Sequence, residues 1–427
     1  MINWLNNFWQ NYQLKVALQR GQQSKAKTIL KHLESGGKLS CVARLYQQQL
    51  KLNNSLDYYR QENSLLTRRL QEVTPNNYFL KPQIEFIDYI YQSFKLNDID
   101  AGLIQSTGID EEVFTALEIS LVEFLTTELN KVPEAKRDRE LAKAIADLAG
   151  LKQGVDPEYN YRLTPHVYMI KYLLDNVYCV YLAWFLIYQQ GLLNKNIKIL
   201  DLAAGPGTSI FSLALLLESL HKFFRLSLAQ ISYYSLEQQA DFQYRGLQFW
   251  RRYIETLARP INAYFNFNTA NLFVYQNYGD RLPKQFFDFI IISHCFFYES
   301  EPRYQSNQIY QQIFQQQLNH NGRVLLIVQG KKLFKAYDIC VTEDKTTEEE
   351  IVQEFLTELG LKLDWYKYLS CTGKRTPNKT EFVKFAKNNL PPQKHLSQLS
   401  KTYLQQHYVS HYAIDDYVIL AKLDRDK

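Results

Sequence analysis

The stretch Lys198-Ile199-Leu200-Asp201-Leu202-Ala203-Ala204-Gly205-Pro206-Gly207-Thr208 decides the fold of this chain. Its first five residues predict a short buried strand, and Ala204 to Gly207 predict a tight turn. An apolar helix is expected from Thr208 to Leu220. A strand, a glycine turn and a helix form the first half of a βαβ unit, and open α/β sheets bind ligands at the carboxyl ends of such strands. The two glycines allow a ligand to approach the backbone, and the helix N-terminus offers N–H groups.

Three kinds of glycine loop have to be told apart here. A dinucleotide loop needs a small residue where this chain has Ile210, and a phosphate loop needs a Lys after Gly207. The remaining pattern, an acid followed by small-x-Gly-x-Gly, resembles motif I of the class I S-adenosylmethionine (SAM)-dependent methyltransferases. The family usually has Gly where this chain has Ala203. The resemblance implies an α/β fold with a seven-stranded Rossmann-like sheet. It also implies a SAM site to which the loop contributes Asp201, Ala203, Gly205, Gly207 and Thr208.

Two later strands supply further candidates for the cofactor site. The second predicted strand, residues 231–237, ends in Glu237. An acid ~20 or more residues after a glycine loop can accept hydrogen bonds from both ribose hydroxyls. Glu237 is therefore the expected ribose ligand, with Asp241 as the alternative. After the third strand, the resemblance implies an acidic or amide residue bonded to the adenine amino group. Asn271 matches in kind, and Asn268 stays open as an alternative.

The fourth predicted strand, residues 286–294, carries the candidate catalytic residues at its end. The sequence Ser293-His294-Cys295-Phe296-Phe297-Tyr298 resembles the substrate-facing motif IV of the same family. It lacks the Asn-Pro-Pro-Tyr type of tetrad found in amino-group DNA methyltransferases. By this resemblance Ser293 belongs to the cofactor site, and His294 lies where a general base meets an acceptor, with Tyr298 as a neighbour in that role. A hydrogen-bonded structural histidine is the alternative interpretation of His294.

Composition limits the class of protein. The chain has 427 residues, of which 46% are hydrophobic, which is enough for two domains and a large core, and its net charge of +5 does not by itself indicate nucleic-acid binding. Its five cysteines form no Cys-x-x-Cys pair, so neither a metal site nor a disulfide framework is predicted. Reduced thiols and a cytoplasmic location are expected. The longest apolar run, residues 177–188, is shorter than the ~20 residues that span a bilayer and predicts a buried helix.

Residues 1–153 predict an N-terminal helical domain, which resembles no family, and residues 154–427 predict the methyltransferase-like domain. Helices are expected over 83–94, 111–129 and 137–151, and a long apolar pattern runs from 39 to 73. The aromatic face of the first helix predicts a core or homodimer contact rather than a helix on a membrane surface.

Predicted strands at 361–368 and 417–423 form the antiparallel edge hairpin that the resemblance implies. Between them lies an insert, residues 372–416, in which the stretch 374–401 holds seven Lys or Arg and one acid. Insertions at this place in the family often shape the acceptor side. An acidic or phosphate-bearing acceptor, RNA included, is therefore expected. A solvated loop is the alternative.

The leading hypothesis is a SAM-dependent methyltransferase with S-adenosyl-L-methionine as its cofactor and an unidentified acceptor. The two motifs are also similar to those of methyltransferase-like ribosomal small-subunit assembly factors, which keep the fold without known transfer. Those factors carry a cysteine cluster for an iron–sulfur centre, which the scattered cysteines here do not match. A protein-binding scaffold built on the helical domain is the third hypothesis, and affinity for SAM separates it from an enzyme.

Overall fold

The computed structural model describes residues 2–19, 23–35, 40, 42–44, 46–47, 50, 79–153, 157–223, 229–258, 261–277, 281–376 and 379–425. The apolar pattern predicted over 39–73 therefore lies largely outside the described residues. The first two helices, α1 (Ile2–Gln19) and α2 (Gln23–Ser35), pack on each other through buried side chains that include Leu14 and Leu33. The aromatic residues Trp9 and Tyr12 of α1 are exposed in the single chain.

A mixed sheet of nine strands organises the rest of the described chain, and its order is β1-β2-β8-β9-β7-β6-β3-β4-β5. Strands β3 to β7 run parallel, while β9 is antiparallel to both of its neighbours, β7 and β8. The bounds of the strands are β1 Asn97–Asp98, β2 Leu103–Gln105, β3 Asn196–Leu202, β4 Gln230–Glu237, β5 Asn262–Thr269, β6 Phe287–Ser293, β7 Leu318–Gln329, β8 Leu361–Ser370 and β9 Asp415–Leu423. The seven predicted strands are confirmed, together with the antiparallel edge, and two short strands extend the sheet beyond them.

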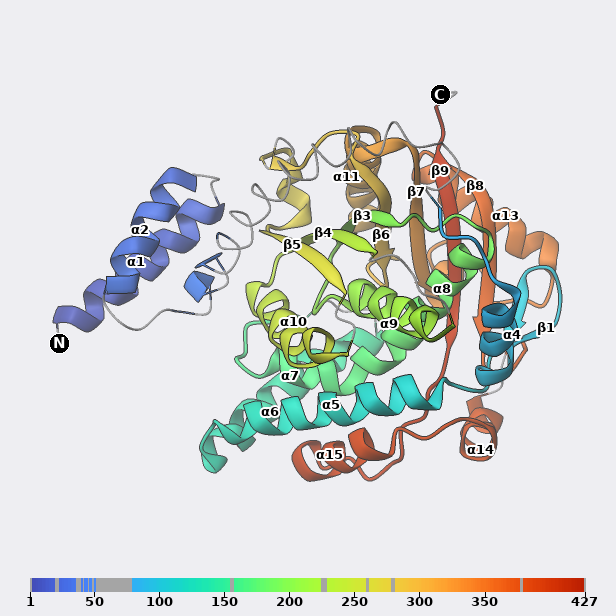
Figure 1. The fold of residues 1–427 in the computed structure, drawn as a ribbon, viewed down its shortest axis with the longest axis horizontal. Coiled ribbons are helices and arrows are strands. Elements are labelled where there is room, and N and C mark those ends of the chain that lie inside the picture. Colours follow the sequence, from blue (N-terminus) through green and yellow to red (C-terminus); the bar gives the residue numbers. More distant parts are fainter. Residues whose placement is uncertain are drawn as a thin grey trace.

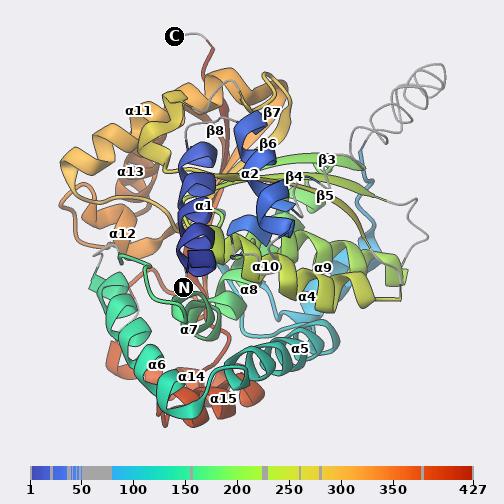
Figure 2. The ribbon, with the colours of Figure 1, turned by 90° about the vertical axis from the view of Figure 1, so that its left-hand side faces the viewer.

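Helices cover both faces of the sheet, as Figure 2 shows. One face carries α8 (Leu174–Gln189), α9 (Thr208–Phe223) and α10 (Ala240–Tyr253), and the other carries α11 (Ser300–Gln317), α12 (Gly330–Lys335) and α13 (Lys345–Glu358). Successive strand residues point to opposite faces, so Ile199 enters the core under the first group and Leu200 the core under the second. Because helices cover both faces of the sheet, strands β3, β4 and β6 are buried on both sides, and their sequences are nearly continuous apolar runs.

The chain before residue 153 differs from the predicted helical domain. Helices α4 (Ile84–Ser93), α5 (Glu111–Asn130) and α6 (Glu134–Leu148) confirm three predicted helices, and the Asp110 carboxylate accepts the Val113 N–H as the N-cap of α5. An all-helical assignment is wrong at 97–105, however, because β1 and β2 pair there and β2 joins β8. Buried side chains of α4, α5 and α6 share one core with those of α8 to α10, so position 153 does not separate two cores.

The insert between β8 and β9 folds into two helices, α14 (Lys379–Asn389) and α15 (Lys394–Leu404), and α15 lies beside α5 and α6 (Figure 1). The Leu396 N–H donates to the Glu118 carboxylate at 2.9 Å, which ties α15 to α5. One cation of the insert, Arg375, is 4% exposed and pairs with Asp100 and Glu348. Because Arg375 is buried and paired, its charge is not available to a ligand in solvent. The insert therefore presents fewer free positive charges than its sequence suggests.

The predicted buried helix at 177–188 is confirmed within α8. A short helix α7 (Thr164–Tyr168) and a π-helical turn (Met169–Leu173) run directly into α8. The whole segment Thr164–Gln189 is long and apolar enough to cross a membrane by composition, and 78% of its most apolar window is buried inside the protein.

Candidate functional site

The strand order reverses at β3, which has β4 on one side and β6 on the other. Ligands bind beyond the carboxyl ends of strands at such a switch point. A cavity of about 680 Å³ opens there and is lined from the ends of β3, β4, β5 and β6 and from the helical segment before the sheet. Of the predicted site residues, those that line it are Ala203, Gly205, Glu237, Asn271, Ser293, His294 and Tyr298.

The glycine loop presents its backbone to this cavity. Ala203 and Gly205 have φ values of 53° and 54°, in the left-handed region, and the Ala203 N–H donates to the Leu236 carbonyl at 2.8 Å. A Cβ placed on Gly205 would meet no atom within 4 Å. Ala203 adopts this left-handed conformation although the related family usually has glycine at the position. The alanine is therefore accommodated at a modest conformational cost.

Glu237 holds the loop in place. One oxygen of its carboxylate accepts the Gly205 N–H at 2.9 Å, and the other accepts the Gln239 N–H at 2.8 Å. The residue is 8% exposed and lines the cavity. A carboxylate has about four acceptor positions, so two backbone bonds leave it able to accept hydrogen bonds from a ligand.

Three residues of the loop motif do not line the cavity. A Cβ on Gly207 would lie 3.2 Å from the Ile210 side chain, so this glycine faces the interior. Thr208 is buried in the first turn of α9. Asp201 lies beneath the loop, where its carboxylate accepts hydrogen bonds from the Ser209 hydroxyl and, at 2.7 Å, from the Tyr233 hydroxyl. These residues shape the loop from behind, whereas the resemblance implies that they belong to the SAM site.

Burial raises the pKa of Asp201 to about 6, while its two hydroxyl partners lower it. A carboxyl whose pKa is raised by folding favours the folded state at low pH, and this contribution is lost as the pH rises through about 6. This group should lower the unfolding free energy of the wild type by about 2 kcal/mol between pH 4 and 7, and we expect Asp201→Asn to remove that decrease. Urea unfolding of both proteins across that range measures it, and parallel pH profiles would contradict the assignment.

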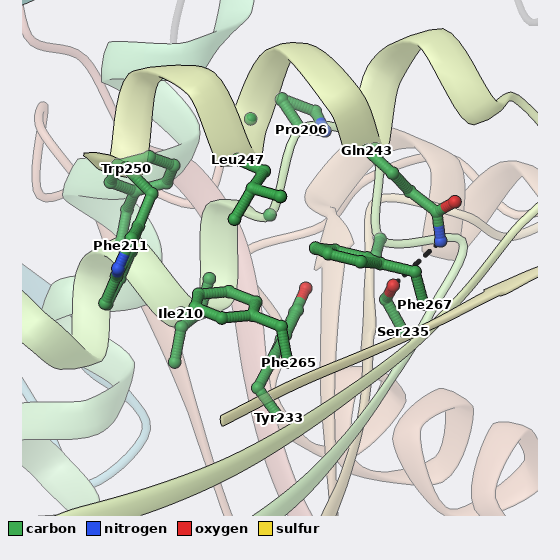
Figure 3. A pocket seen from close by; sticks show the side chains of 14 residues that line it. Pro206, Ile210, Phe211, Tyr233, Ser235, Gln243, Leu247, Trp250, Phe265 and Phe267 are labelled. Atoms are coloured by element: carbon green, nitrogen blue, oxygen red, sulfur yellow. Dashed lines mark hydrogen bonds between the residues drawn. The ribbon is translucent and has the colours of Figure 1, made fainter. Parts of the chain in front are cut away.

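The loop packs against α10 in a contact that the sequence alone did not reveal. Figure 3 shows Pro206 beside Leu247 and Gln243 of α10, with Phe265 and Phe267 of β5 below them. The space that these residues enclose is about 10 Å³, which is close to the least that holds one water molecule, so it is no ligand site. A Cβ on Gly246 would lie 2.0 Å from the Pro206 carbonyl oxygen. Glycine at 246 is therefore what allows the loop to approach α10.

The two asparagines proposed as candidates at the end of β5, Asn271 and Asn268, differ in their position relative to the cavity. The Asn271 side chain accepts the Phe273 N–H at 2.8 Å, and Asn271 lines the cavity at its exposed rim. Asn268 instead donates to Asn266 at 3.2 Å. Of the two, Asn271 is the one that a cofactor in the cavity would meet.

His294 is held at both ring nitrogens. Its Nδ1 lies 2.9 Å from the Ser293 hydroxyl, and its Nε2 lies 3.1 Å from the Asp416 carboxylate of β9. The backbone of His294 has φ 60°, and its N–H donates to the Ile327 carbonyl. As arranged, both nitrogens are engaged by the protein, which favours a hydrogen-bonded histidine over a free general base. Tyr298 lines the cavity beneath Lys335, whose Nζ lies 3.6 Å from the centre of its ring.

Aromatic side chains that the motifs do not include close one side of the cavity. Tyr168 packs edge-on against Phe242 of α10, and Tyr159 does the same. The π-helical turn begins directly after Tyr168 and contains Tyr172, and the centres of the two rings lie 5.1 Å apart. No sequence motif predicts that Phe242 lines the cavity, because its position depends on how α10 packs against the glycine loop.

No protein-family model and no curated protein matches the chain. Solved SAM-dependent methyltransferases do match it. One from Methanosarcina mazei is 15% identical, covers 54% of this chain and 94% of its own, and has a TM-score of 0.31. One from Leishmania major is 13% identical, covers 81% and 97%, and has a TM-score of 0.30. The plantazolicin methyltransferase, solved with S-adenosylhomocysteine (SAH), is 12% identical, covers 74% and 99%, and has a TM-score of 0.30. TM-scores of this size carry no argument, so the fold assignment rests on the order and direction of the strands.

Proposed function

We propose that this protein binds S-adenosyl-L-methionine in the cavity at the ends of β3, β4 and β6 and transfers its methyl group to an acceptor. In this proposal the ribose hydroxyls donate to Glu237, the methionine part lies along the backbone of Ala203 and Gly205, and the adenine lies near Asn271. The volume of about 680 Å³ falls within the range of ~300–1,000 Å³ that ligand pockets occupy.

The carboxylate of Glu237 is the observation that carries the proposal. It is buried, it faces the cavity, and it fixes the Gly205 N–H at 2.9 Å, so that one side chain joins the loop to the ribose position. This is the arrangement expected of an acid that follows a glycine loop by one βα unit. The hydrogen bond between Gly205 and Glu237 connects the glycine loop to the end of β4, 32 residues later in the sequence.

The acceptor would enter between the aromatic wall and the segment 293–299. The methyl of a sulfonium is already activated, so the protein's contribution is to position the acceptor in line with it and, for some acceptors, to remove a proton. The charged residues that line the cavity include Glu237, Glu299 and Lys332, which do not select for an anion. An acidic or phosphate-bearing acceptor therefore remains an expectation that rests on the insert alone.

Glu237→Ala is expected to weaken SAM binding about 10- to 150-fold, because a charge-assisted hydrogen bond contributes about 1.5–3 kcal/mol. Isothermal titration calorimetry with SAM and SAH on wild type and variant measures it. Glu255→Ala, which removes an exposed acid after α10, is the matched control and should bind as wild type does. An unchanged dissociation constant for Glu237→Ala, with intact circular dichroism, removes Glu237 from the site.

Transfer itself is tested by incubating the protein and SAM carrying a heavy methyl group with cell extract, followed by mass spectrometry of all products. A labelled product that Glu237→Ala fails to form identifies the acceptor. SAM binding without any labelled product favours the assembly-factor hypothesis, and the absence of SAM binding favours a scaffold.

A further inference from the structure

Three side chains of types that can bind a metal ion converge at His294, which lines the cavity, from distant parts of the sequence. Cys179 lies on α8, His294 follows β6, and Asp416 lies in β9. Their donor atoms, a sulfur, a nitrogen and an oxygen, all lie within 4.8 Å of one another. Cys179 is 1% exposed and Asp416 is 8% exposed, so solvent hardly reaches either. Among the residues that the structure describes, this set is the group of His, Cys and acidic side chains that fits one cation.

The spacing of these atoms suits a tetrahedral zinc ion. Nitrogen and oxygen ligands at ~2.0 Å from zinc lie about 3.3 Å apart, and a sulfur ligand at ~2.3 Å lies about 3.5 Å from a nitrogen. The His294 Nε2 and the Asp416 oxygen are 3.1 Å apart, and the Cys179 sulfur is within 4.8 Å of both. Movements of about 1.3 Å or less therefore bring all three donors to bonding distance.

The surroundings of His294 are those of a ligand rather than of a free side chain. A histidine that binds a metal usually donates its second ring N–H to a fixed partner, which sets the tautomer. Here the second nitrogen, Nδ1, lies 2.9 Å from the Ser293 hydroxyl, which can accept that hydrogen. The φ of 60° at His294 is an unfavourable conformation that the surrounding structure maintains, as is common at functional sites.

We propose that Cys179, His294 and Asp416 form a binding site for Zn²⁺ or a similar transition-metal ion next to the cavity, which His294 lines. Thiolate, imidazole and carboxylate together are ligands that zinc prefers, and three protein ligands leave a fourth position for water or substrate. On binding, the Cys179 thiol gives its proton to solvent, and the proton of the neutral His294 ring resides on Nδ1. The absence of a Cys-x-x-Cys pair does not oppose this site, because it uses a single cysteine.

This proposal goes beyond methyl transfer and changes the expected role of one residue. His294 lines the cavity, so a cation on its Nε2 would border the space proposed for the acceptor. His294 would then hold the metal and would not act as a general base. An acceptor with a hydroxyl or thiol group is favoured, since such groups lose a proton readily when they bind zinc.

The test uses the purified full chain and does not require the acceptor. Elemental analysis should find about one zinc ion per chain, and after chelation the protein should bind about one Co²⁺ with the intense near-ultraviolet band of thiolate ligation. Cys179→Ala should abolish that band, and Asp416→Asn, which keeps the shape of the side chain, should weaken Co²⁺ binding at least tenfold. Cys340→Ala, which removes an exposed thiol, is the control and should keep both the band and the stoichiometry.

Two outcomes overturn the metal site. One is a wild-type protein that binds no Co²⁺ with a thiolate band after chelation, which would leave Asp416, His294 and Cys179 as a hydrogen-bonded cluster. The other is an unchanged band in Cys179→Ala. If Cys179→Ala does not fold, Asp416→Asn decides, because equal Co²⁺ affinity in that variant also rejects the site. SAM binding by wild type and Glu237→Ala is measured separately, so the two proposals fail independently.

Discussion

Gly246→Ala is expected to weaken SAM binding roughly 100-fold although residue 246 lies outside the cavity. The added Cβ would lie 2.0 Å from the Pro206 oxygen and 2.7 Å from the Pro206 carbonyl carbon, and both are backbone atoms that cannot rotate away. The loop has to move by about 1 Å or more, and misplacement on that scale costs roughly 100-fold at a well-organised site. Crowding in a packed interior also lowers stability by about 1–3 kcal/mol.

Calorimetry with SAM and urea unfolding measure the two effects of Gly246→Ala separately. Arg251→Ala is the matched control, since it alters the exposed face of the same helix and should change neither quantity. Wild-type affinity in Gly246→Ala would show that the contact between the loop and α10 does not position the site. A correctly folded variant with lost affinity supports it.

Gly205→Val is the second large effect, with no detectable SAM binding expected. A β-branched residue is poorly tolerated at φ 54°, and its side chain would enter the open space where a Cβ meets no atom within 4 Å. Gly205→Ala separates the two causes, because Ala203 already adopts φ 53° in the same loop. We expect affinity to fall in the order Gly, Ala, Val when measured by calorimetry. Equal affinity of all three would remove the loop from the site.

The sequence predicted the central sheet well because each of its strands is a separate apolar run. Residues 196–202, 230–237 and 287–293 are buried on both faces, so their strand character is visible without knowledge of their partners. Glu237 was found for the same reason, since it ends such a run. Strands β1 and β2 were missed because two and three residues are too few to show a hydrophobic period. Pairing alone makes them strands: β2 pairs with β8, and β1 pairs with β2.

The rest of the site depends on contacts between residues that are distant in the chain. Asp416 meets His294 across 122 positions, and nothing near either residue indicates the other. From the sequence alone, Gly246 is a residue that destabilises a helix, and only its contact with the Pro206 backbone explains why a glycine is needed there. Asp201 belongs to the motif, yet it bonds to Ser209 and Tyr233 beneath the loop, because β3 directs its side chain away from the cavity. Motifs therefore predicted loops that line the cavity, while packing determined which of their side chains reach it.

The pairing of β2 with β8 also affects how copies of this protein can associate. The backbone of β8 would otherwise offer unpaired N–H and C=O groups to any strand of another chain, and such an open edge promotes aggregation and strand exchange. Residues 103–105 pair with the last three residues of β8, 368–370, and the Tyr368 N–H donates to the Gly102 carbonyl at 2.7 Å. The new border strand, β1, is only two residues long and gives an incoming strand little to pair with. Continuing the sheet beyond β1 is thus disfavoured, and a dimer at this part of the border would have to form through side-chain contacts between helices or loops.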